Sequence, residues 1–202
     1  MQAAMSGFPR ALIWSNFRQV TSSPSPPHQA QSSSSYTMAG GRRVSTVDRA
    51  FRVAGLRITV STNTAASWAV AAARSNPDLL RHEQGHYDIT GLVARDLAIG
   101  ILDLSLDTDA VASMTGAGNT TADHQHYAQR EFQRDIDDLG RQATTLLNRL
   151  QTNPMTRADC LYDRQTRHGQ DKAAQLRWDG LFSQAKLSAQ RFRLMLSMAG
   201  AL

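Results

Sequence analysis

The chain has 202 residues, enough for one domain with a sizeable hydrophobic core. Its 41% hydrophobic and 19% charged residues are typical of a globular protein and argue against intrinsic disorder. The formal charge of +5 comes mostly from scattered arginines. No basic stretch is interleaved with aromatic residues, so the pattern argues against a nucleic-acid-binding protein.

No apolar run approaches the roughly 20 residues of a membrane-spanning helix, so we expect no membrane span. The apolar run at residues 11–14 is too short for the core of a signal peptide. We expect a soluble chain, but its compartment stays open. Either a signal has been removed and the protein is periplasmic or secreted, or it leaves the cell by another route, or it does not leave the cell. The single cysteine, Cys160, excludes an intramolecular disulfide and is expected to be a small core residue.

The first third of the chain predicts a small β portion. Residues 11–17 are a short apolar start that we expect to pin the N-terminus to the core. Residues 21–41 are rich in serine and proline and predict a flexible loop, in which His28 is interpreted as a loop residue rather than a ligand. Residues 44–62 predict strand, because apolar and polar side chains alternate over residues 56–61. That strand is either an exposed edge that can hold an extended peptide or a plain core strand.

The rest of the chain predicts helices. Residues 76–104 predict a long helix, because a capping residue and a proline stand at its start and apolar residues recur at helical spacing. Residues 106–121 predict a loop, residues 122–151 a second long helix, and residues 156–198 a third helical region. The predicted fold is α+β over residues 1–202 as one domain, with a small sheet on a long helix and two further long helices.

The stretch Leu-Leu-Arg-His-Glu-Gln-Gly-His at residues 79–86 contains the pattern His-Glu-x-x-His. Because four residues make about one helical turn, His82 and His86 share one face of the predicted helix and can both ligate one metal ion. Glu83 follows the first ligand directly and can take a proton from water as a general base. The chain holds only two glutamates, Glu83 and Glu131, so a chance match has odds of roughly one in several hundred. The sequence therefore predicts a catalytic Zn²⁺ site.

A catalytic zinc ion usually has three protein ligands and one open position. The residues themselves leave two candidates for the third ligand. Glu131 lies on the next predicted helix, and His168 lies in a polar cluster with Tyr162 and Asp163 inside an apolar helical pattern.

Three segments carry a family resemblance. The first is Trp-Ser-Asn-Phe at residues 14–17, where Asn16 stands at a usual Asp. The second is Ser67-Trp68 followed by the metal motif, which extends to Ile89 and has Tyr87 at a usual Phe. The third segment is Tyr162-Asp163-x-x-Thr166-x-His168, followed by Gln175 and Trp178. Together they resemble the DUF922 family of bacterial zinc-dependent proteases, which are placed with the zincin metallopeptidases.

The resemblance implies a zincin-like fold, a small N-terminal sheet packed on the metal-site helix. It favours His168 over Glu131 as the third ligand. It also implies that Tyr162 can donate a hydrogen bond to the developing oxyanion, and that Asp163 or Asp88 orients a ligand imidazole. Another interpretation stays open for these three: a tyrosine hydroxyl that ties two helices, and aspartates at solvated or capping positions.

The sequence thus predicts a zinc-dependent metalloendopeptidase that acts on a peptide or protein substrate. Two alternatives stay open. One is a catalytically inactive zinc-binding module with an interaction or regulatory role, and the other is a secreted bacterial effector protease with one specific target.

Overall fold

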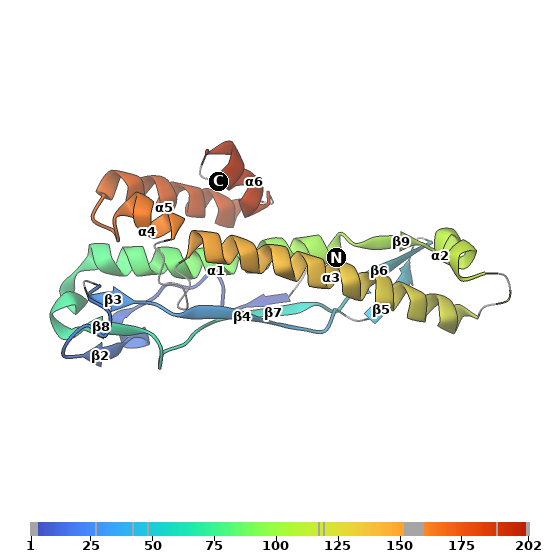
Figure 1. The fold of residues 1–202 in the computed structure, drawn as a ribbon, viewed down its shortest axis with the longest axis horizontal. Helices are drawn as coiled ribbons and strands as arrows, with labels where there is room; N and C mark the ends of the chain where they lie inside the picture. The colour runs from blue at the N-terminus through green and yellow to red at the C-terminus, as the bar shows by residue number, and fades with distance from the viewer. Residues whose placement is uncertain are drawn as a thin grey trace.

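The computed structural model describes residues 4–26, 28–41, 43–47, 49–116, 118, 120–151, 160–188 and 190–200. It is an α+β protein in which two long helices, α1 (Pro77–Leu102) and α3 (Thr121–Leu150), run side by side (Figure 1). Sheets from the N-terminal part of the chain lie on one side of α1, and the C-terminal helices lie on the other. Within the described part of the chain, no helix combines the length and apolar character needed to cross a membrane.

Helix α1 begins where the sequence predicts, because its first turn is well capped. The Asn76 side chain accepts hydrogen bonds from the amides of Asp78, at 3.0 Å, and Leu79, at 3.2 Å. Gly91, which would weaken an isolated helix, has a packing role here. A Cβ at this position would lie 2.1 Å from a ring carbon of Phe8, so its absence lets the N-terminal segment pack on the helix.

Strand β7 (Arg57–Thr62) packs against α1 and confirms the predicted alternation. Ile58 and Val60 are buried, while Arg57 and Thr59 are exposed. This strand pairs on one side with β1 (Ala4–Ser6), in parallel, and on the other with β4 (Ser34–Ala39), antiparallel. Because both sides are paired, the interpretation of this strand as a free edge is wrong, and the core-strand interpretation is confirmed.

Two further sheets complete the β portion of the described residues. In one, β8 (Trp68–Val70) lies between β2 (Arg18–Val20) and β3 (Ala30–Gln31). In the other sheet, β6 (Ala50–Ala54) lies between β5 (Arg43–Val47) and β9 (Ser105–Asp107). The predicted strand at 44–62 is therefore three strands, because the chain turns through positive φ at Arg49 and Gly55.

The predicted loop at residues 21–41 is only partly right, because residues 21–26 and 28–29 lie outside strands, whereas β3 and β4 follow them. Its serine-rich composition suggested a loop, but pairing with β7 and β8 holds the backbone extended. The expectation that residues 11–17 pin the N-terminus is confirmed. The Gln84 side chain on α1 accepts the amide of Leu12 at 2.7 Å and donates to the carbonyl of Arg10 at 3.1 Å.

The predicted second long helix is confirmed by α3, whereas the loop and the third helical region are only partly right. Within the predicted loop, β9 is followed by α2 (Thr108–Thr115), whose cap Asp107 accepts two backbone amides. The C-terminal region is the following set of shorter helices: α4 (Leu161–Thr166), α5 (Lys172–Leu187) and α6 (Phe192–Met198). Residues 156–159 and 189 of that prediction lie outside the described residues.

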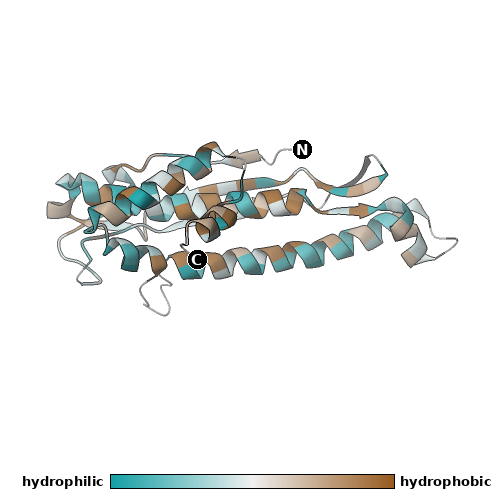
Figure 2. Ribbon diagram, turned by 90° about the horizontal axis from the view of Figure 1, so that it is seen from above, coloured by the Kyte–Doolittle hydropathy of each residue, from teal (hydrophilic) through white to brown (hydrophobic). Residues whose placement is uncertain are grey.

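Apolar and polar residues alternate along α3 in Figure 2, as expected for a helix with one buried face. The residues buried on that face recur every three to four positions or their multiples: Ala128, Phe132, Ile136, Ala143, Leu146 and Leu150. This face packs on α1, so α1 is enclosed by α3, the sheets and α5. The metal motif therefore lies in the interior of the fold.

Candidate metal centre

His82 and His86 lie one turn apart on α1, as the sequence predicts, and a third group from another element joins them. The Asp163 Oδ1 atom, from the first turn of α4, lies 3.1 Å from His82 Nε2 and 3.0 Å from His86 Nε2. One ligand atom from each residue lies within 4.8 Å of those of the other two. Two imidazoles and a carboxylate at this spacing could hold a metal ion.

The group is buried, but not equally on all sides. The His82 and Asp163 side chains are 3% and 5% exposed, whereas that of His86 is 14% exposed. Solvent therefore reaches the group from the side of His86.

Asp163 is held in place by the start of its own helix. The Cys160 Sγ atom caps α4 by accepting the Asp163 amide at 3.3 Å, and the thiol donates to Asp163 Oδ2 at 3.0 Å. One carboxylate oxygen is thus bound by the thiol while the other faces the imidazoles. The sequence predicted a buried Cys160 but not this contact.

The charges of the group are mutually stabilised. Burial raises the pKa of Asp163, but the charge of His86 and hydrogen bonds from His168, His82 and His86 outweigh burial and leave that pKa lowered. Burial lowers the pKa of His86, and the negative charges of Asp163 and Glu83 more than offset this. Asp163 is therefore ionised at this site.

Two residues orient the His82 ring through Nδ1, the nitrogen that does not face Asp163. Its Nδ1 lies 3.4 Å from Gln175 Oε1 on α5 and 3.4 Å from Thr166 Oγ1 on α4. A proton on Nδ1 that is donated to these oxygens leaves the Nε2 lone pair directed at the group. Thr166 and Gln175 stood in the third motif of the sequence, but the motif gave them no role.

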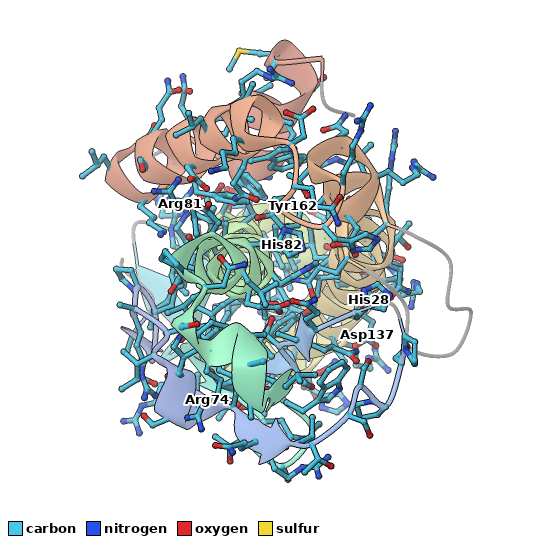
Figure 3. The ribbon with its side chains drawn as sticks, turned by 90° about the vertical axis from the view of Figure 1, so that its left-hand side faces the viewer. His28, Arg74, Arg81, His82, Asp137 and Tyr162 are labelled. Atoms are coloured by element: carbon cyan, nitrogen blue, oxygen red, sulfur yellow. The ribbon has the colours of Figure 1, made fainter. Side chains whose placement is uncertain are left out.

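Tyr162 lies beside His82 (Figure 3), and the two rings stack at a centroid distance of 4.9 Å. Its hydroxyl donates to the His82 carbonyl at 3.2 Å and accepts from Gln175 Nε2 at 2.8 Å. The hydroxyl also touches Gly85, where a Cβ would lie only 2.0 Å from it. Because Tyr162 is fully buried and its partners are on α1 and α5, this geometry favours the helix-tying role over the oxyanion role.

Glu83 is also buried, and a backbone amide from the β portion binds its carboxylate. Its side chain Oε2 accepts the Ser32 amide at 2.6 Å. Ser32 lies between β3 and β4, in the segment that the sequence predicted to be a loop. The sequence contained no sign of this contact.

His168 lies outside the group of three, beside it. It follows α4 in a turn where Arg167, His168 and Gly169 all have positive φ, of 49°, 54° and 80°. Its Nδ1 is 3.5 Å from Asp163 Oδ1, and its side chain is 33% exposed. The turn is tight because Gly169 packs on His82, and a Cβ on that glycine would lie 2.9 Å from the His82 Cβ.

The ring of His28 meets that of His168 edge-on at 4.6 Å, so this loop histidine lies at the site without joining the group.

Two other predicted residues have different partners. Glu131 forms an ion pair with Arg134 one turn further along α3 and is not part of the group. Asp88 does not orient an imidazole but accepts Gln84 Nε2 at 3.0 Å and Lys186 Nζ at 2.6 Å, which ties α1 to α5. Burial raises the pKa of Asp88, and Lys186 partly offsets this.

No protein-family model, curated protein or solved structure was found to match the chain. The resemblance to the DUF922 family therefore stays a prediction.

Proposed function

We propose that this chain is a zinc-dependent metallopeptidase in which His82, His86 and Asp163 hold the metal and Glu83 is the general base. One observation carries the proposal. Two imidazole Nε2 atoms and a carboxylate oxygen converge in a group that solvent reaches only at His86, and the residue beside the first histidine is a buried glutamate. Two histidines and one carboxylate are a known catalytic donor set for zinc.

The distances from the Asp163 oxygen to the two histidine nitrogens are compatible with zinc. In a tetrahedral site with bonds of about 2.0 Å, ligand atoms lie about 3.3 Å apart. The Asp163 oxygen lies 3.0–3.1 Å from the two histidine nitrogens, so a small displacement would admit the ion. Three protein ligands leave one position open, as catalysis requires.

Asp163 and His168 exchange the roles that the resemblance implied. Asp163 has its oxygen in the group, and His168 contacts that oxygen from outside. We therefore assign the third ligand to Asp163 and assign His168 to the support of its carboxylate.

The chemistry follows from the residues around the group. A bound zinc ion would supply a Lewis acid for the scissile carbonyl and lower the pKa of water. Glu83 takes the proton from water and returns it to the leaving amine. His82 is held by Thr166 and Gln175, and Glu83 by Ser32, so both side chains are oriented before substrate binds.

The test is metal content and hydrolysis of casein or a mixed fluorogenic peptide library. We expect about one zinc per chain in the wild type, lost in Asp163→Ala and retained in His168→Ala and Glu131→Ala. Glu83→Gln should retain zinc and lose hydrolysis. Zinc loss with His168→Ala but not Asp163→Ala would restore the original ligand assignment. Zinc binding without hydrolysis by the wild type would favour the catalytically inactive zinc-binding module.

A further inference from the structure

We propose that the main-chain amide of Ser32 is a positioning group for the general base Glu83, and that Ser67 and Trp68 hold this amide in place. The inference rests on the proposed function and deepens it. It gives the serine-rich segment, which the sequence suggested was a flexible loop, a part in the active centre.

Ser32 binds Glu83 at two points. Its amide donates to Glu83 Oε2 at 2.6 Å, and its hydroxyl donates to the Glu83 carbonyl at 3.2 Å. The first bond is short, as expected for an amide that donates to a carboxylate. Glu83 is only 3% exposed, so little water competes for that oxygen. The bond holds Oε2 and leaves the other carboxylate oxygen to act as the base.

The residues on both sides of Ser32 are bound to the pair Ser67-Trp68. Gln31 pairs with Trp68 in the antiparallel ladder of β3 and β8, and its side chain accepts the indole N–H at 3.2 Å. On the other side, the Ser33 amide donates to Ser67 Oγ at 2.9 Å. Ser67 is fully buried and donates in turn to the carbonyl of Asn63 at 2.8 Å.

The general base Glu83 needs a partner outside its own helix. A glutamate side chain has three rotatable bonds, and α1 by itself does not fix the carboxylate. A displacement of about 1 Å of a reacting group can cost about 100-fold in rate. A backbone amide whose neighbours are both bound, by the buried residues Ser67 and Trp68, is a stiffer anchor than another flexible side chain.

The test compares two substitutions at one position. Ser32→Pro removes the amide hydrogen, whereas Ser32→Ala keeps it and removes only the hydroxyl. With the wild-type metal content in both variants, we expect Ser32→Pro to lower kcat by about 10- to 100-fold at unchanged KM. Ser32→Ala should stay within about threefold of wild type. Ser67→Ala should lie between them, because it frees only one side of the segment.

A second readout does not depend on activity. The chain contains two glutamates, so glutamate labelled with ¹³C at Cδ gives two side-chain carboxyl resonances in an NMR spectrum, from Glu83 and Glu131. Glu131→Gln assigns them. We expect Ser32→Pro to move the Glu83 resonance and leave that of Glu131 unchanged. If Ser32→Pro does not fold, Glu83→Gln tests the same bond, because the amide proton of Ser32 should move upfield.

The outcomes separate this inference from the proposed function. An unmoved Glu83 resonance in folded Ser32→Pro, or an unmoved Ser32 amide proton in Glu83→Gln, would overturn the positioning role. So would equal kcat values for Ser32→Pro and Ser32→Ala. A Ser32→Pro variant that is more active than wild type would also overturn it, since the segment would then inhibit the base. Absence of hydrolysis by the wild type would refute the proposed function and leave the NMR test of the contact valid.

Discussion

The contact between Gly85 and Tyr162 predicts a large effect from adding one methyl group. In Gly85→Ala, the new Cβ would lie 2.0 Å from the Tyr162 hydroxyl oxygen and 2.5 Å from its Cζ. Ordinary contacts are about 3.5 Å or longer, so the ring must move by more than about 1 Å. Tyr162 is fully buried between His82 and Trp178, with ring centroids 4.9 and 5.3 Å away, so any movement of its ring displaces buried neighbours.

The magnitude follows from three contributions. Overpacking in a core costs about 1–3 kcal/mol. Displacing the hydroxyl from the His82 carbonyl and from Gln175 leaves buried polar groups without partners, at about 1–3 kcal/mol more. Alanine in place of a helical glycine returns about 0.5–1 kcal/mol. We therefore expect Gly85→Ala to lower the free energy of unfolding by about 1–5 kcal/mol.

The assay is urea unfolding followed by circular dichroism, with two matched controls. Gly140 in α3 and Gly180 in α5 have nothing within 4 Å of an added Cβ. Gly140→Ala and Gly180→Ala should each raise the free energy of unfolding by about 0.5–1 kcal/mol. In the double variant Gly85→Ala/Tyr162→Leu, the two costs should be less than additive, because the clash is removed. A Gly85→Ala protein as stable as the controls would show that the Tyr162 hydroxyl does not pack on α1 in this way.

Three further predictions test other parts of the site and fold. Gly169→Ala should weaken zinc binding about tenfold or more in a chelator competition, because φ of 80° disfavours alanine and the new Cβ would displace His82; unchanged affinity would show that this turn does not hold His82. Asn76→Ala should lower the free energy of unfolding by about 1 kcal/mol in urea without changing zinc content, because it removes the cap of α1; a loss of zinc would mean that the helix start and the site are coupled. Zinc at 100 times its dissociation constant should stabilise the wild type by about 2.7 kcal/mol and raise its Tm. The same zinc concentration should leave the Tm of Asp163→Ala unchanged. If the Tm of this variant rose as much as that of the wild type, Asp163 would be excluded as a ligand.

Local signals in the sequence correctly predicted the long helices. The cap and proline at the start of α1 and the apolar spacing of α3 act within one or two turns, so no distant contact is needed to read them. The same locality placed His82 and His86 on one face with Glu83 beside them. The sequence by itself therefore determined two of the candidate metal ligands and the candidate base.

The tertiary structure decided what depends on distant segments. His168 and Asp163 both stood in one polar motif, and only the left-handed turn after α4 and the packing of Gly169 on His82 put Asp163 in the group and His168 outside it. The composition of the serine-rich segment predicted a loop, but its residues in β3 and β4 pair with β8 and β7. Asp88 was predicted to orient an imidazole, but in the structure it accepts a hydrogen bond from Lys186 on α5.

The physical reason is the range of the interactions. Helix hydrogen bonds join residues four apart, so their pattern is written in the nearby sequence. The contacts of Glu83 with Ser32 and of His82 with Gln175 join residues 51 and 93 positions apart. Their geometry depends on how whole elements pack, and that information is spread over the entire chain.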